Sequence, residues 1–315
     1  MKKVGLALGG GTALGLAHIG VIEILEKNKI PIDYISGTSS GAIIGALYAS
    51  GMNISDIKKI AETTKWENLV DFKIPIKGIL SGDRLEKFIR VLLKNKTFEE
   101  LDIPLAVIAT DIYNGEKVTF RKGDVASAIR ASISIPSIFV PFRYQNRVLV
   151  DGGVVDPVPV EILKKMGADI TIAVDLSKPI KNISIKSTSG KSKRFMKKIE
   201  KKMIEQELDE INKYASNHKA SIPWFLQSIL NHPQKIFDYL LKKRLKTPKL
   251  LTITSNSFEI MVNALSKYAL LNADYVINPT LNKFNRFDFD KSKEIINSGK
   301  NATTRSIKDI KKLIK

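Results

Sequence analysis

A short run of small residues, placed between a strand-like and a helix-like segment, constrains the fold of this chain most. The run is Gly37-Thr38-Ser39-Ser40-Gly41, with apolar residues before it and a helical pattern over 41–50 after it. Strand, tight turn and helix in this order form the context that a G-x-S-x-G nucleophile elbow requires. Gly37 and Gly41 avoid a clash at the strained turn, and the helix points N–H groups toward the serine. The pattern predicts a nucleophile at Ser39; the alternative is a helix N-cap in which Ser39 or Ser40 only satisfies backbone donors.

The histidines of the chain are poorly placed to act as a base for this serine. There are three, at positions 18, 218 and 232. A serine–aspartate–histidine triad in the α/β-hydrolase order needs a histidine after the acid, and the two late ones, His218 and His232, lie in a lysine-rich region. His18 precedes the serine, in the first helical pattern. We therefore expect a carboxylate to activate Ser39.

Asp151 is the best-placed carboxylate. It ends the apolar stretch Val148-Leu149-Val150 and begins the turn Gly152-Gly153. Open α/β sheets build their sites at the carboxyl ends of strands, which is where this residue is expected. Asp-Gly is also an ordinary turn pair, so the pattern by itself fits a structural turn as well as a catalytic base.

The amino-terminal segment contributes a glycine-rich loop. An apolar strand over 4–8 is followed by Gly9-Gly10-Gly11-Thr12 and then by a helical pattern that ends near 28. Successive glycines expose backbone N–H groups and allow close approach of a ligand, which suits an oxyanion hole or a phosphate cradle. A dinucleotide fingerprint is the competing interpretation, but it requires G-x-G-x-x-G and an acidic residue that closes the next strand. Here the last glycine comes one residue late and Asp33 opens that strand, which disfavours dinucleotide binding.

These three motifs, in this order, resemble the patatin-like phospholipase family, in particular its bacterial branch. Two more stretches are similar to the family: 106–120 resembles its central strand and hairpin, and 131–141 resembles its serine- and proline-bearing block before the aspartate. The resemblance covers roughly 4–178 and 250–313. One position departs from the pattern, because Leu14 stands where many relatives carry Arg or Lys. A cation that could help to hold the loop or a substrate phosphate is therefore missing there.

The resemblance implies a serine–aspartate dyad without histidine. Ser39 is then the nucleophile, Asp151 the base, and the oxyanion loop is formed by Gly9, Gly10, Gly11 and Thr12. The implied reaction is cleavage of a lipid ester through an acyl-enzyme, from which water releases the fatty acid. The ordinary pKa of an aspartate is about 3.9. Partial burial must therefore raise its basicity for the dyad to work near neutral pH. No cofactor is expected.

Alternating strand-like and helical segments predict a three-layer α/β/α fold with a mainly parallel central sheet. At 315 residues and 43% hydrophobic composition, the chain can bury the core of one α/β domain with an excursion. We expect a patatin-like catalytic domain made of 4–178 and 250–313, and a basic, partly helical insertion over 179–249. The expected strands are 4–8, 32–36, 105–110, 117–121, 147–150, 170–175 and 275–277. The expected helices are 15–28, 41–50, 54–64, 82–94, 159–166, 256–270 and 290–314.

Composition narrows the remaining possibilities. The chain has no cysteine, so neither a disulfide nor a cysteine-based metal site is expected, and three histidines are too few for a histidine-rich metal site. The start of the chain imitates a signal peptide, but three glycines interrupt its apolar run, and we expect the segment to be retained. No apolar stretch reaches the length of about 18 residues that a membrane span needs. A cytoplasmic location, with contact at the membrane periphery, is the resulting expectation.

Positive charge is concentrated in 178–249. The net charge of the chain is +19, and this segment holds 18 Lys and Arg residues against 6 Asp and Glu residues. Its basic amphipathic stretches with aromatic residues suit an anionic membrane interface. A lid, a partner-docking element and plain packing are the alternatives. Nucleic acid binding is not expected, because no recognition motif accompanies the charge.

Two classes of function fit the sequence. The first is a lipid acyl hydrolase, and the second is a regulatory or scaffold protein that keeps the fold with little activity. Intact Ser39 and Asp151 favour the hydrolase, whereas Leu14 leaves room for the second class. Labelling by a serine-reactive fluorophosphonate probe distinguishes the two.

Overall fold

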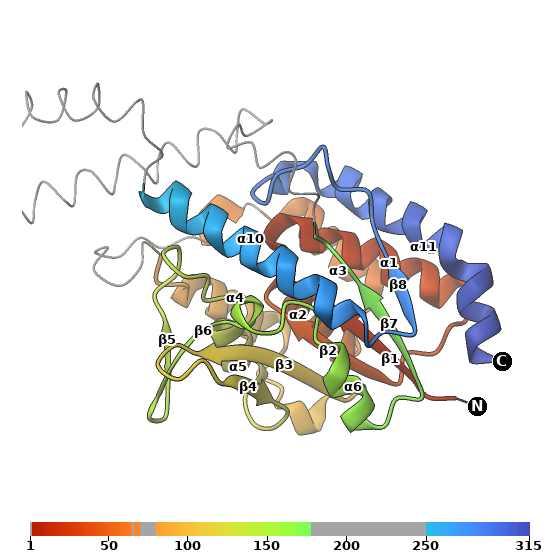
Figure 1. Ribbon diagram of the computed structural model, residues 1–315, viewed down its shortest axis with the longest axis horizontal. Coiled ribbons are helices and arrows are strands. Elements are labelled where there is room, and N and C mark those ends of the chain that lie inside the picture. The colour runs from red at the N-terminus through yellow and green to blue at the C-terminus, as the bar shows by residue number, and fades with distance from the viewer. Residues whose placement is uncertain (1, 65, 70–79, 178–249) are drawn as a thin grey trace, which may run out of the picture.

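A computed structural model describes residues 2–64, 66–69, 80–177 and 250–315 (Figure 1). The basic insertion expected over 179–249, with the membrane contact expected there, lies outside these residues. So do His218 and His232.

The described residues form one mixed eight-stranded sheet. Its order is β5-β6-β3-β2-β1-β7-β8, and β4 pairs with β3 beside this path. Strands β3, β2, β1, β7 and β8 run parallel to one another. Strands β4, β5 and β6 run antiparallel to their neighbours. The bounds are β1 Val4–Leu8, β2 Tyr34–Thr38, β3 Leu105–Asp111, β4 Lys117–Phe120, β5 Phe142–Tyr144, β6 Arg147–Asp151, β7 Ile170–Val174 and β8 Tyr275–Ile277.

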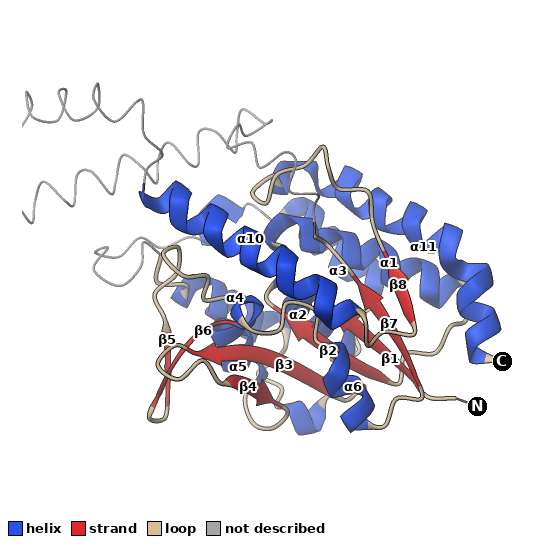
Figure 2. Ribbon diagram, in the orientation of Figure 1, coloured by secondary structure: helices blue, strands red, loops and turns tan. Residues whose placement is uncertain are grey.

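Helices cover both faces of this sheet (Figure 2). Side chains alternate between the faces along each strand, so Leu6 and Leu8 point to one face and Ala7 to the other. The face of the leucines packs against α1 (Ala17–Lys27), α2 (Ser40–Ala49), α3 (Ile54–Thr63), α4 (Asp83–Leu92), α5 (Val125–Ser132) and α11 (Ser292–Ile314). The face of Ala7 packs against α6 (Val160–Met166) and the carboxyl-terminal part of α10 (Leu250–Leu270). The expected three-layer α/β/α architecture is therefore confirmed.

Strand β3 brings the carboxyl ends of β2 and β6 together. Ile108 pairs with Thr38 of β2, the next residue Ala109 pairs with Asp151 of β6, and both pair with β4 as well. Because a strand has only two edges, β2 and β6 must share the edge of β3 that faces away from β4. They approach each other along that edge from opposite ends. Ser39 follows the end of β2, and Asp151 ends β6, so this register places the two residues side by side.

The expected elements agree with the structure except at particular points. The strand expected at 32–36 is β2, shifted to Tyr34–Thr38, because the Asp33 carboxylate accepts the Val4 N–H and the Lys3 ammonium group at the entry to the strand. The helix expected from 15 starts as the 3-10 turn η1 (Thr12–Leu16), and α1 follows it. Strand β5 and helix α5 were not expected. None of the helices in the described part of the chain has the length and apolar character needed to cross a bilayer.

Candidate active site

Ser39 occupies a strained turn between β2 and α2. Its backbone has φ +55° and ψ −122°, a region that side-chain-bearing residues rarely adopt. Gly37 and Gly41 allow the turn to close: a Cβ on Gly41 would lie 2.1 Å from the Leu8 carbonyl oxygen, and one on Gly37 would lie 2.6 Å from the Ala42 nitrogen. Both glycines of the sequence motif are therefore required by close backbone approach.

Asp151 is buried beside this turn. Its Oδ1 accepts a hydrogen bond of 2.7 Å from the Gly153 N–H, and its Oδ2 has no partner of normal hydrogen-bond geometry among the described residues. Gly152 makes the next turn possible, because a Cβ there would lie 2.3 Å from the Ile108 carbonyl oxygen. The Asp-Gly-Gly motif thus fixes one carboxylate oxygen and leaves the other available.

Burial raises the pKa of the Asp151 carboxyl from its ordinary value of 3.8 to about 6. The Ser39 hydroxyl, the Gly153 N–H and the charge of Arg286 act in the opposite direction. The Ser39 side chain therefore interacts with the Asp151 carboxyl, although Oδ2 lacks a hydrogen bond of full geometry. Such a contact is common before substrate binds. A carboxyl with a pKa near 6 is a stronger base than an ordinary aspartate.

The end of helix α5 holds both residues. The Ser39 N–H donates to the Ser132 hydroxyl at 2.8 Å, and the Asp151 N–H donates to the Ser134 carbonyl at 2.9 Å. Arg130 fastens this segment in turn, because its guanidinium donates to the Ser134 hydroxyl at 2.6 Å. All three of these supporting side chains are buried. The stretch 131–141 resembles the family's block before the aspartate, but the sequence does not predict these supporting roles of Arg130, Ser132 and Ser134.

The predicted glycine loop lies against the serine turn, and most of its N–H groups are already bonded. The Gly9 N–H donates to Val174 O, the Gly10 N–H to Pro157 O, and the Gly11 N–H to the Ser40 hydroxyl, at 3.3, 3.0 and 3.0 Å. A Cβ on Gly10 would lie 3.3 Å from the Ser39 Cβ, so the loop passes directly beside that side chain.

Two N–H groups, one in the glycine loop and one in the serine turn, remain available. Those of Thr12 and Ser40 donate to no described residue. The Ser40 N–H belongs to the first residue of α2, where the helix dipole favours negative charge. The Ser40 N–H, which directly follows Ser39 in the chain, is therefore an unoccupied donor in the serine turn.

His18 lies behind the glycine loop. Its ring is fully buried, and Nε2 is 2.8 Å from the Gly9 carbonyl oxygen. Burial lowers the pKa of His18 to about 4, so the ring is neutral at pH 7 and Nε2 carries the proton that it donates to that carbonyl. The residue supports the loop and is not placed as a base.

Leu14 cannot carry out the role of a cation that faces substrate. Its side chain is fully buried in the core. The neighbouring Gly15 packs directly on the serine turn, since a Cβ there would lie 2.3 Å from the Ser40 hydroxyl oxygen. The loop is held by packing at this point.

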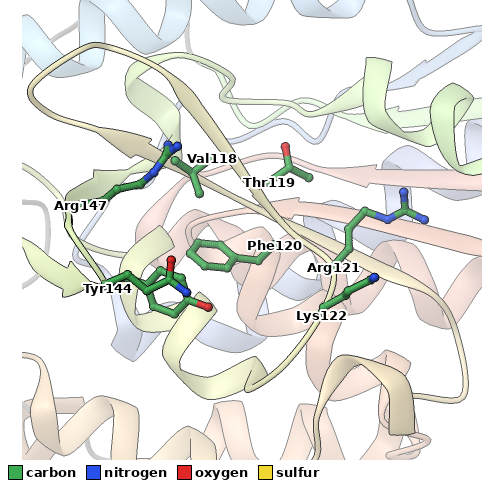
Figure 3. A pocket seen from close by; sticks show the side chains of 8 residues that line it. Val118, Thr119, Phe120, Arg121, Lys122, Tyr144 and Arg147 are labelled. Carbon is green, nitrogen blue, oxygen red and sulfur yellow. The ribbon is translucent and has the colours of Figure 1, made fainter.

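A separate cavity of about 560 Å³ lies between β4 and the β5–β6 hairpin (Figure 3). Its lining is basic and aromatic, and it contains Val118, Thr119, Phe120, Arg121, Lys122, Tyr144, Gln145 and Arg147. None of the predicted site residues lines it, so this cavity is not the site built around Ser39.

Comparison with known proteins decides the family. Residues 6–164 match the family model described as patatin-like phospholipase. The chain belongs to the patatin-like phospholipase family. An uncharacterised NTE family protein of Mycobacterium tuberculosis is 37% identical over 184 residues, which is 56% of this chain and 49% of that protein. Lysophospholipase NTE1 of Debaryomyces hansenii is 36% identical over 181 residues, 56% of this chain and 12% of that protein.

The structural comparison supports the patatin-like fold. VipD of Legionella pneumophila matches 98% of this chain and 67% of its own with a TM-score of 0.58, at 15% sequence identity. The chain spans about half the length of the mycobacterial relative and a small part of the yeast lysophospholipase.

Proposed function

We propose that this protein is a lipid acyl hydrolase that cleaves carboxylic esters through an acyl-enzyme on Ser39, with Asp151 as the general base. One observation carries the proposal: a serine in a strained turn contacts a buried aspartate that has one unbonded oxygen and a pKa raised to about 6. Serine nucleophiles need such an adjacent base, since the free hydroxyl is a weak nucleophile. Asp151 and the surrounding residues belong to the part of the chain that matches the family.

The proposed reaction has two stages. The Ser39 hydroxyl attacks the ester carbonyl and passes its proton to Oδ2 of Asp151, which then protonates the leaving alkoxide. The ester C–O bond breaks and the acyl group stays on Ser39. Water attacks this second ester in the same way, with Asp151 again taking the proton, and the fatty acid leaves.

The oxyanion of each tetrahedral intermediate needs N–H donors that are free before the reaction. Sequence patterns point to Gly9, Gly10, Gly11 and Thr12 as a group. We assign the donor role to the N–H groups of Thr12 and Ser40, because the three glycine N–H groups already bond to other acceptors. In this assignment the glycines provide room and hold the loop in place.

A phospholipid or lysophospholipid is the substrate that the comparisons favour. The family is described as patatin-like phospholipase, and one relative is called a lysophospholipase. We also propose that the segment 178–249 brings the protein to anionic lipid, a surface role supported by its 18 basic against 6 acidic residues.

Fluorophosphonate labelling tests the proposal. The wild-type protein should label at Ser39 and hydrolyse p-nitrophenyl esters, and Ser39→Ala should do neither. Ser50→Ala is a matched control, because Ser50 caps the far end of α2 and its hydroxyl donates to Leu47 O. A folded wild-type protein that neither labels nor hydrolyses any ester would instead support the regulatory or scaffold function.

A further inference from the structure

Arg286 lies in the loop between β8 and α11, next to the glycine loop. Its carbonyl oxygen accepts the Ala13 N–H at 3.0 Å, at the second residue of η1. The loop that carries Arg286 is well anchored, because Phe284 is fully buried and Phe289 stacks on Trp66 with ring centroids 4.7 Å apart. The position of Arg286 is thus fixed relative to the start of the glycine loop.

The side chain of Arg286 is tied to helix α10. Its Nε lies 3.2 Å from the Glu259 carboxylate in an ion pair that lacks hydrogen-bond geometry, and the two side chains are only 17% and 18% exposed. Helix α10 also covers the aspartate turn: Phe258 and Val262 would both lie 3.4 Å from a Cβ on Gly153. The Arg286–Glu259 pair therefore joins the helix above Asp151 to the loop beside Ser39.

We propose that Arg286 is a positioning residue of this site: its carbonyl holds the start of η1 beside the glycine loop, and its guanidinium, fixed by Glu259, holds one positive charge toward the Ser39–Asp151 pair. The proposal rests on the function proposed above. The sequence gives no local sign of this role, because neither Arg286 nor Glu259 belongs to a motif.

The charge of Arg286 reaches Asp151. Among the described residues, it is the charged side chain that lowers the pKa of Asp151, against the effect of burial. Glu259 pairs with Arg286, so we expect loss of the Glu259 charge to strengthen the effect of Arg286 on Asp151, and loss of the Arg286 charge to remove it. The other charged side chains on elements near Asp151 are Arg130 on α5, Asp111 on β3, Arg147 on β6, Lys267 on α10, and the ion pair of Lys117 with Asp156.

The opposite effects expected from removing the Arg286 charge and the Glu259 charge on the Asp151 pKa provide the test. The pKa of Asp151 is measured by ¹³C NMR titration of protein labelled at the aspartate carboxyl carbons, and Asp151→Asn identifies the signal. Arg286→Gln should raise that pKa, and Glu259→Gln should lower it, each on the order of 0.5 pH unit. Lys283→Gln is the matched control: it removes an equal charge from the same loop, at a side chain that is 72% exposed, and should leave the Asp151 titration unchanged.

The acid limb of ester hydrolysis should move in the same two directions. If the Arg286–Glu259 pair had only a structural role, both substitutions would shift the Asp151 pKa in the same direction. Shifts of equal sign, or no shift in Arg286→Gln, would therefore overturn the proposal. If Arg286→Gln does not fold, Glu259→Gln and Arg286→Lys provide the test. Glu259→Gln should still lower the Asp151 pKa, and Arg286→Lys, which keeps the positive charge, should leave that pKa close to the wild-type value. The NMR titration requires no catalysis, so it is read independently of whether Ser39 labels.

Discussion

Replacing the proposed base Asp151 by its neutral isostere asparagine should abolish the proposed ester hydrolysis and stabilise the fold. In Asp151→Asn, the side-chain oxygen can still accept the Gly153 N–H, while the negative charge disappears. Loss of a general base costs about 10²–10⁴-fold in rate. The folded state, in contrast, should become more stable. At a pH above the pKa of Asp151, the wild-type protein carries a buried negative charge that the asparagine variant lacks.

The magnitude follows from the pKa of Asp151, which burial raises from 3.8 to about 6. A carboxyl whose pKa is raised by folding contributes stability below 3.8, and that contribution is lost as the pH rises through 6. Since one pKa unit corresponds to about 1.4 kcal/mol, ionising Asp151 destabilises the folded state by roughly 3 kcal/mol at pH 8 and by about 1.6 kcal/mol at pH 5. Asp151→Asn avoids this cost at both values of pH.

Urea unfolding followed by circular dichroism at pH 5 and pH 8 measures the difference in unfolding free energy. We expect Asp151→Asn to be more stable than wild type at both, with a gap about 1.4 kcal/mol larger at pH 8. Asp309→Asn, at an exposed position on α11, should change the unfolding free energy by less than about 0.5 kcal/mol. Lower stability of Asp151→Asn than of wild type at pH 8, or a stability difference that does not depend on pH, would contradict the raised pKa of Asp151.

Three further predictions concern the supports of the site and the basic segment. His18→Ala should lower the unfolding free energy by about 2–4 kcal/mol and slow ester hydrolysis, because Gly9 O loses its donor, whereas His18→Gln should retain more activity with an unchanged acid limb in the pH–rate profile. Ser132→Ala should reduce kcat about tenfold with little change in KM for a soluble ester, since Ser39 loses the acceptor of its N–H. Changing Lys242, Lys243 and Arg244 to Ser and Trp224 to Ala should weaken co-sedimentation with phosphatidylglycerol vesicles at low salt but leave soluble-ester hydrolysis nearly unchanged, and equal binding of wild type to neutral and anionic vesicles would contradict the surface role.

The sequence predicted the parts of the site whose physical causes are local. Gly37, Gly41 and Gly152 each lie so close to backbone atoms of other residues that a side chain as small as a Cβ would collide with them. Asp151 was expected at the carboxyl end of a strand, and that is where β6 ends. These features depend on short stretches of chain, so their spacing is visible without knowing the rest of the fold.

The supports of the site could not be predicted in this way, because they depend on contacts between distant segments. Helix α5 was not expected, although Asp124 caps it by accepting the Ser127 N–H. Without that helix, nothing in the sequence places the Ser132 hydroxyl under the Ser39 N–H. The approach of β2 and β6 along one edge of β3 is a matter of register, which local periodicity does not determine.

That register explains how an aspartate can replace a histidine in the proposed chemistry. An imidazole base reaches a serine over its own length and is oriented by a third residue. Here the ends of β2 and β6 adjoin, so a short carboxylate already lies within reach of Ser39 and needs no relay. The same packing buries the carboxylate, and burial raises its pKa to about 6. Proximity and basicity therefore have one structural cause, and a change that opens the β2–β6 junction to water should weaken both together.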